Sequence, residues 1–173
     1  MSRFVVMCAD FYRLKLISEL HGTSFKVDEV ENVLVGAVDT ALAAENLLLA
    51  ARSFGLGGVM IGGIRNNPEG VAALLKLPAY TIPIMGICLG YPAEQPWQKP
   101  RLPQRVVVHE ETYDAGRIME GLEAYDATMA DYYSRRSSGR ITGGWTPKMA
   151  EYLSAPRRAH LRTFIEGQGF GLK

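Results

Sequence analysis

The chain has 173 residues, enough for one domain with a substantial hydrophobic core. Hydrophobic residues make up 47% and charged residues 21%, which excludes a disordered chain. The formal net charge of +1 gives no general electrostatic reason to expect nucleic acid or an acidic membrane as a partner. Cys8 and Cys88 each lie within an apolar run, so we interpret both as buried thiols in a reducing, cytoplasmic compartment.

The chain begins with a continuous apolar run over residues 4–9, the pattern of a strand buried on both faces. This run is too short for a secretory signal. It has no earlier partner strand in the sequence. A short helix that ends near His21 and Gly22 is expected to follow.

A long helix is predicted from Asp28, which with Glu31 forms a carboxylate version of a capping box, to about Ser53. Its polar residues form one narrow stripe, repeating every seven positions, and the rest is mainly Val, Leu and Ala. We therefore expect a central core helix, with a second subunit covering one face. Because Asp39 and Glu45 interrupt the segment, no membrane span is expected.

Residues 54–67 contain a short predicted buried strand, residues 58–61, flanked by glycine pairs. A dinucleotide fingerprint would need glycine where Met60 stands, and a P-loop would need Lys-Ser or Lys-Thr where Ile64 and Arg65 stand. Both phosphate-loop interpretations fail. A tight strand with glycine turns and a surface that a flat ligand can approach both remain open.

Asn67 and Pro68 are typical of a helix start, and this helix is expected to end near Leu77. Residues 81–90 form the second run expected to be buried on both faces. The remaining expectations, in chain order, are a proline-rich loop over 92–103, a strand or extended segment over 106–109, a helix over 118–134, a basic loop over 137–144, a short helix from Trp145 and a last helix over 157–166.

Alternating strands and helices would normally suggest a parallel, Rossmann-like sheet, but only two strong strands follow the first one. We therefore expect a helix-rich protein with a small sheet, or a sheet that is completed elsewhere.

No Ser-His-Asp or Cys-His set is evident, and His109 with Glu110 and Glu111 lacks the spacing of a metal site. Cations do recur in loops, and arginine forks and lysine suit phosphate, although solvated surface cations give the same pattern. These loop cations are Arg65, Lys99, Arg101, Arg135, Arg136, Arg140, Arg157 and Arg158. Nucleic-acid binding by the 135–140 loop is disfavoured because few aromatic residues lie nearby.

Three motifs carry a family resemblance: residues 54–67, residues 86–92 and residues 99–103. Together they resemble the nitroreductase family, in particular its NADPH-dependent branch of oxygen-insensitive nitroreductases and NADPH–flavin oxidoreductases. The segment from Tyr132 to Trp145 is similar to the C-terminal extension of that branch.

This resemblance implies an α+β, nitroreductase-like fold that is helix-rich around a small sheet, with residues 1–173 as a single domain. It further implies an obligate homodimer in which residues 117–173 wrap the partner subunit, with FMN at the subunit interface. NADPH would reduce the flavin, which would then reduce nitroaromatics, quinones or free flavin in a ping-pong reaction. The flavin would carry the chemistry, so no catalytic side chain, no metal and no membrane partner are expected.

By the same resemblance, Met60, Ile61, Gly62 and Gly63 match the segment that lies along the flavin ring. Lys99 and Arg101 match the cations that hold the ring edge or the phosphate.

The resemblance also places Arg136 and Arg140 in the loop that in this branch grips the NADPH phosphates, although Arg140 is about one place off the family pattern. Arg158 matches a substrate-side arginine near the flavin.

The chain departs from the family pattern at its start. Members begin with a further segment that carries a basic helix for the FMN phosphate, and we expect this domain to be N-terminally incomplete. The alternative function is a catalytically impaired remnant that acts only as a dimerisation module.

Overall fold

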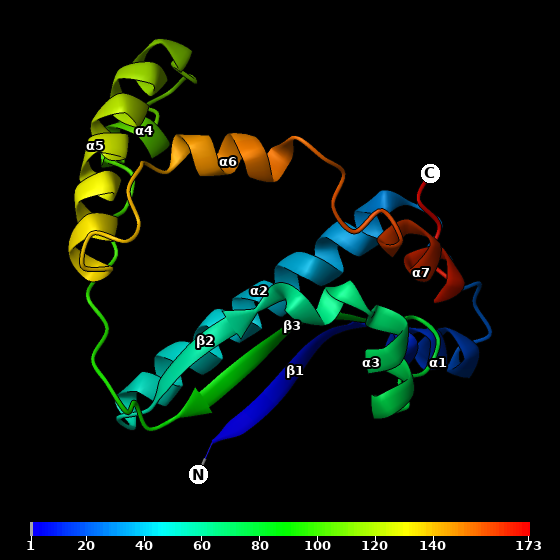
Figure 1. The fold of residues 1–173 in the computed structure, drawn as a ribbon. Coiled ribbons are helices and arrows are strands. Elements are labelled where there is room, and N and C mark those ends of the chain that lie inside the picture. Colours follow the sequence, from blue (N-terminus) through cyan, green and yellow to red (C-terminus); the bar gives the residue numbers. More distant parts are fainter. Residues whose placement is uncertain (1) are drawn as a thin grey trace. The chain divides into compact units, whose positions relative to one another are not determined.

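A computed structural model describes residues 2–173. The chain divides into two compact units (Figure 1). Unit 1 comprises the N-terminal part of the chain, up to Ala93, together with Arg158–Lys173, and unit 2 is Glu94–Arg157. Unit 1 contains the whole sheet described for residues 2–173, whereas the regular elements of unit 2 are helices.

The sheet of unit 1 has three strands in the order β1-β3-β2, and both pairings are antiparallel. β1 is Arg3–Asp10, β2 is Gly57–Ile61 and β3 is Thr81–Gly90. The sequence correctly predicted the positions of all three strands. The prediction that the first is buried on both faces is wrong: in β1 Ala9 is buried, whereas Phe4 is 54% exposed. β1 pairs with β3, which lies later in the sequence, and Phe4 stands opposite Cys88.

The prediction that the strand around residues 58–61 is buried is wrong. Val59 is 55% exposed and Met60 is 38% exposed, because β2 lies at the edge of the sheet described for residues 2–173 and has β3 as its one neighbour there. Gly58 is required by packing, since a Cβ there would lie 2.5 Å from the side chain of Leu48. Glycine thus lets the long helix approach this strand closely.

The long helix α2, Val30–Ser53, contacts all three strands and lies across one face of the sheet (Figure 1). Its end was predicted correctly, but its start was not: the N-cap is Glu29, and no side chain caps the helix. The contact with β1 occurs at Gly36, where a Cβ would lie 2.8 Å from the ring of Phe11 and 3.0 Å from Ala9.

Within the described chain, α2 is buried along one side and not all round. Only one stripe is buried, namely Gly36, Thr40, Ala44 and Ala51. By length and composition alone the helix could cross a membrane, so on those criteria Asp39 and Glu45 do not exclude a span. Of its most apolar window, 17% is buried. Such a single helix is weak evidence for a membrane span, because core helices of soluble proteins pass the same test.

The other helices of unit 1 lie near one end of the sheet (Figure 1). They are α1 (Tyr12–Leu20), α3 (Pro68–Leu75) and α7 (Leu161–Gly167), with the 3₁₀ turn η1 (Gly62–Asn66) between β2 and α3. The predicted cap is confirmed: the Asn67 side chain accepts a hydrogen bond from the Gly70 amide at 2.9 Å. The last helix begins at Leu161, four residues later than the start predicted at 157.

The core of unit 1 joins the C-terminal segment to the sheet. Its buried members include Ala9, Ile82, Phe164 and Phe170. The rings of Phe11 and Phe170 meet edge to face, with centroids 5.4 Å apart. Backbone hydrogen bonds add to this attachment, including one of 2.7 Å from the Tyr80 amide to the Gln168 carbonyl.

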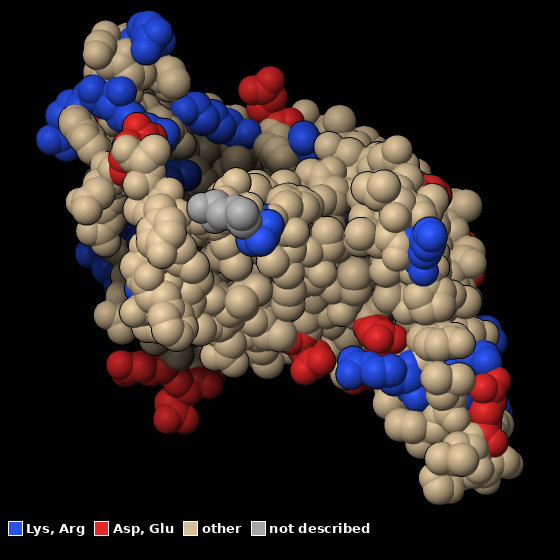
Figure 2. Space-filling view, turned by 90° about the horizontal axis from the view of Figure 1, so that it is seen from below, with Lys and Arg blue, Asp and Glu red and all other residues tan. Residues whose placement is uncertain are grey.

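The sheet face opposite α2 is open in the described chain. Phe4 is 54% exposed, and its ring lies over Gly86, where a Cβ would clash at 2.3 Å. Cys88, expected to be buried, is exposed next to it, whereas Cys8 is half-buried. Figure 2 views the molecule from the β1 side and shows a broad surface of uncharged residues there.

Unit 2 consists of α4 (Gln104–Val107), the turn η2 (Ala115–Arg117), α5 (Ile118–Arg136) and α6 (Thr146–Leu153). Residues 106–109 were expected to be extended, but Val106 and Val107 belong to α4 and Val106 is buried there. Gly121 of α5 would meet the Val106 side chain at 2.0 Å if it carried a Cβ, so α4 packs directly on α5. The core of this unit is Tyr125, Met129 and Tyr132.

Candidate functional site

The glycine segment forms a bare strip of backbone where β2 ends and η1 begins. Ile61 is half-buried, Gly63 is exposed, and a Cβ on Gly63 would meet only Ile61 Cγ2 at 3.7 Å. A Cβ on Gly62 would lie 3.1 Å from Nη2 of Arg65. The backbone is therefore open at Gly63, and the Arg65 guanidinium lies against Gly62.

Arg65 is held by the sheet itself. Its Nη1 donates a hydrogen bond to the main-chain carbonyl of Ile84 on β3. The side chain is half-buried, so its charge lies in a fixed position next to Gly62.

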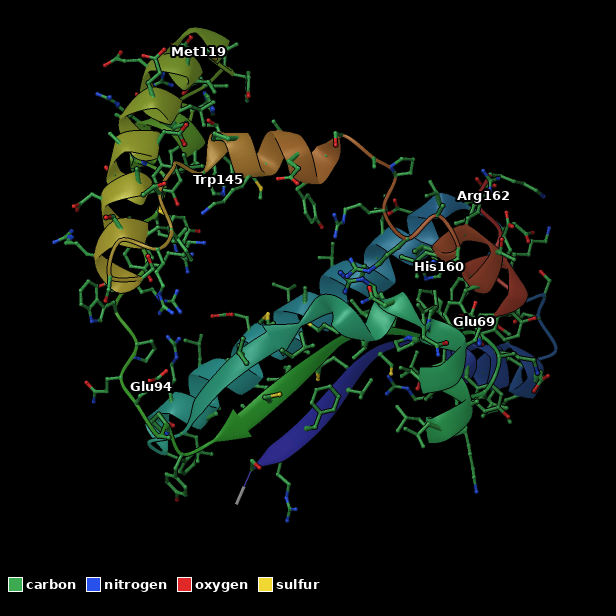
Figure 3. The ribbon with its side chains drawn as sticks, in the orientation of Figure 1. Glu69, Glu94, Met119, Trp145, His160 and Arg162 are labelled. Carbon is green, nitrogen blue, oxygen red and sulfur yellow. The ribbon has the colours of Figure 1, made fainter. Side chains whose placement is uncertain are left out.

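The C-terminal part of the chain returns to this turn at two points. Arg158 Nε donates to the Asn66 side-chain oxygen at 2.9 Å, across 92 residues of sequence. His160 Nε2 lies 3.0 Å from the carbonyl oxygen of Arg65, and a carbonyl only accepts, so this nitrogen carries the hydrogen of the bond. Figure 3 shows His160 on the segment before α7, next to η1.

The predicted site residues of unit 1 are thus brought together. Met60 and Ile61 end β2, Gly62 and Gly63 begin η1, and Arg158 is attached to the same turn through Asn66.

The other predicted residues belong to unit 2. Lys99 Nζ lies 6.0 Å from the ring centroid of Tyr133, and Arg101 is exposed. Arg136 Nη1 lies 3.5 Å from the hydroxyl of Tyr132, and Arg140 Nε donates to the Ser137 carbonyl at 3.1 Å.

Sequence reasoning missed Asn66 and His160 as members of the site. Asn66 stands within the motif of residues 54–67, so the doublet that it forms with Asn67 was a usable signal. Nothing marked His160, because its partner Arg65 is 95 residues away in sequence. In unit 2, Lys148 was also missed, and its Nζ lies 3.5 Å from the Tyr133 ring centroid.

Three of the described groups have shifted pKa values: Cys8, Lys15 and Asp126. The hydrogen bond to Glu19 raises the pKa of Lys15. Burial, with a smaller effect of the Asp10 charge, raises the pKa of the Cys8 thiol. Hydrogen bonds from Thr146 lower the pKa of Asp126. Within residues 2–173, no group of three or more His, Cys, Asp or Glu side chains is placed to hold a metal ion.

The residues of unit 1 fit the ring portion of a flat cofactor. A flat ring needs backbone without side chains on one face and donors at its edge, and Gly62, Gly63 and the Arg65 guanidinium meet that need.

Two protein-family models match the sequence of the chain. The nitroreductase family matches residues 5–91, and the nitroreductase family C-terminal domain matches residues 99–173. The chain therefore belongs to the nitroreductase family.

Individual relatives agree with this assignment. A Cr(VI) reductase of Pseudomonas sp. strain G-1 is 44% identical, over 97% of this chain and 69% of the relative. An FMN reductase [NAD(P)H] of Bacillus subtilis strain 168 is 40% identical, over 96% of this chain and 68% of the relative. The solved structure of the hypothetical oxidoreductase YcnD from Bacillus subtilis superposes with a TM-score of 0.96 at 39% identity, covering 98% of this chain and 70% of that one. The expected nitroreductase-like fold is confirmed.

Proposed function

We propose that the chain is an FMN-dependent NAD(P)H oxidoreductase that reduces nitroaromatics, quinones or flavins. The observation that carries the proposal is the exposed Gly63 next to the half-buried Gly62 and the Arg65 guanidinium, in a chain 40% identical to an FMN reductase. These comparisons do not favour the alternative of a remnant without catalytic activity.

Bound FMN would supply the redox chemistry, in a ping-pong cycle that takes a hydride from NADPH and returns two electrons and protons to the acceptor. Met60, Ile61, Gly62 and Gly63 would lie along its ring. Lys99 and Arg101 would hold the ring edge or the phosphate, since both are cations on a proline-framed segment.

The other cations would bind the two substrates. Arg136 and Arg140 would bind the NADPH phosphates, because arginine forks match phosphate oxygens. Arg158 would lie on the acceptor side, attached to the glycine turn by Asn66.

A homodimer through α2 is part of this proposal. The helix exposes apolar side chains at four-residue intervals, with Leu34 at 55%, Val38 at 58% and Leu42 at 63%. A contiguous apolar helix face of this kind is typical of a subunit interface. Residues 117–173 would wrap the partner. The free thiols and the use of NADPH favour a cytoplasmic location.

The proposal is tested on the purified protein. We expect a yellow protein, or one that takes up FMN on titration, and NADPH oxidation that depends on a nitrofuran or menadione. A colourless protein that takes up no FMN and oxidises no NADPH would exclude it. If such an inactive, flavin-free protein is a dimer, the alternative of a remnant that acts only as a dimerisation module is supported instead.

Chromate is a second acceptor to test, because of the 44% identity to a Cr(VI) reductase. NADPH-dependent loss of chromate absorbance would support it. If the enzyme reduces a nitrofuran but not chromate, chromate is excluded as an acceptor and the proposed oxidoreductase function stands.

A further inference from the structure

We propose that Asn66 is a positioning residue for Arg158, and that the pair makes the site prefer acceptors that carry a planar anionic group such as a carboxylate. This inference rests on the proposed function, since it concerns the acceptor side of that same site.

The Asn66–Arg158 contact is anchored on both sides. Asn66 is the last residue of η1, and Nε of Arg158 donates to its side-chain oxygen at 2.9 Å. Two residues further on, His160 binds the Arg65 carbonyl at 3.0 Å. Arg158 itself has a left-handed backbone with a φ of 54°, which costs energy for a residue with a side chain. The segment is therefore held in one conformation by its contacts with the turn.

The hydrogen bond at Nε decides which edge of the guanidinium is used. Arginine presents a side edge, formed by Nε and one terminal nitrogen, and an end edge, formed by both terminal nitrogens. Because Asn66 occupies Nε, the end edge is left for a ligand. Two parallel N–H groups on that edge match the two oxygens of a carboxylate.

The partner of Arg158 is an amide and not an acid, which preserves the positive charge. Five other arginines of the described chain pair with carboxylates: Arg13, Arg105, Arg117, Arg135 and Arg162. Within residues 2–173 no ion pair involves Arg158. Asn66 thus orients the guanidinium without neutralising it, as expected of a group that binds an anion.

The position relative to the glycine strip supports the same role. A 3₁₀ turn rises about 2.0 Å per residue, so Asn66 lies roughly 8 Å along the turn from Gly62. That spacing is about the length of a substituted benzene ring. An acceptor beside the flavin ring that is proposed to lie along Gly62 and Gly63 would therefore be within about one ring length of the Asn66–Arg158 pair.

The test compares two acceptors of equal size, 4-nitrobenzoate and its neutral counterpart 4-nitrobenzamide, as the ratio of their kcat/KM values. In Asn66→Leu we expect this preference for the anion to fall about tenfold, which is about 1.4 kcal/mol, mainly through KM. In Asn66→Asp the hydrogen bond can form, so the melting temperature should stay near that of the wild type. The added charge would nevertheless abolish the preference for the anion.

The matched control is Asn67→Ala, at the neighbouring position. Asn67 caps α3, so this variant should melt at a lower temperature but keep the preference for the anion. A binding measurement without turnover completes the test: benzoate, followed by protein fluorescence, should bind Asn66→Asp and Asn66→Leu about tenfold more weakly than the wild type.

Two results separate the inference from the proposed function. If the wild type oxidises NADPH with menadione but Asn66→Asp keeps the preference for the anion, the inference is wrong and the function stands. If the wild type shows no flavin-dependent NADPH oxidation, the proposed function fails. Unchanged benzoate affinity in both variants would overturn the inference regardless of activity.

Discussion

The carboxylate of Asp126 on α5 holds Thr146, the first residue of α6. Asp126 Oδ1 accepts a hydrogen bond from the Thr146 amide at 2.8 Å, and Oδ2 accepts one from the Thr146 hydroxyl. The Trp145 amide also donates to Oδ1, at 2.7 Å. One acidic side chain therefore satisfies two backbone donors at the start of a helix, where no intrahelical partners exist.

Asp126→Ala should lower the stability of the protein at neutral pH, and the effect should depend on pH. The folded pKa of Asp126 is depressed from its usual value of 3.8, chiefly by the Thr146 hydroxyl and then by the Thr146 amide. A depressed folded pKa stabilises the protein above the unfolded pKa, and this contribution is lost as the pH falls through the folded pKa.

Thermal melts of the wild type and Asp126→Ala from neutral pH to below pH 4 would check this prediction. The gap between their melting temperatures should narrow in acid. Asp131→Asn is the control, because Asp131 forms an exposed ion pair with Arg135 on the same helix and should change the melting temperature little. If the difference in melting temperature between the wild type and Asp126→Ala did not change with pH, the proposed role of the Asp126 carboxylate would be wrong.

Gly63→Val should weaken FMN binding without unfolding the protein. An added Cβ meets only Ile61 at 3.7 Å, so the fold tolerates it, but the side chain occupies the surface proposed for the flavin ring. Overpacking costs about 1–3 kcal/mol, so the dissociation constant for FMN should rise roughly 5- to 150-fold. FMN titration measures it. Gly167→Ala, with nothing within 4 Å, is the control and should bind FMN like the wild type.

Arg136→Ala should raise the KM for NADPH roughly 10- to 150-fold and affect NADH less, since a charge-assisted contact to a phosphate is worth about 1.5–3 kcal/mol. Arg140→Ala should have a smaller effect, because its Nε is already bonded to the Ser137 carbonyl. Steady-state kinetics with both nucleotides would measure these changes. Arg135→Ala is the matched control, as Arg135 pairs with Asp131 at 2.5 Å. Equal effects of all three substitutions would argue against a specific phosphate contact.

Leu42→Lys should convert the proposed dimer to a monomer, because an unpaired charge buried in an apolar interface costs several kcal/mol. Light scattering of the wild type and the variant would measure the molar mass. Leu74→Lys replaces another exposed leucine, 81% exposed on α3, and should leave the dimer intact. Dimeric Leu42→Lys would exclude this face of α2 as the interface.

The sequence by itself determined the elements whose pattern is local. The apolar run at residues 4–9, the cap at Asn67 and the end of α2 near Ser53 are read from neighbouring residues, and all three are correct. The family was also determined by short motifs, since residues 54–67 form one continuous segment.

Only the tertiary structure decided which surfaces are covered. The side chains of α2 are apolar nearly all round, but one stripe packs on the sheet and the opposite face is exposed, because a helix can bury only the side that meets a neighbour. The Asn66–Arg158 bond joins residues 92 positions apart, and no local pattern encodes such a contact. The glycine segment predicted a surface open to a ligand, and the folded chain placed Arg65, His160 and Arg158 around it.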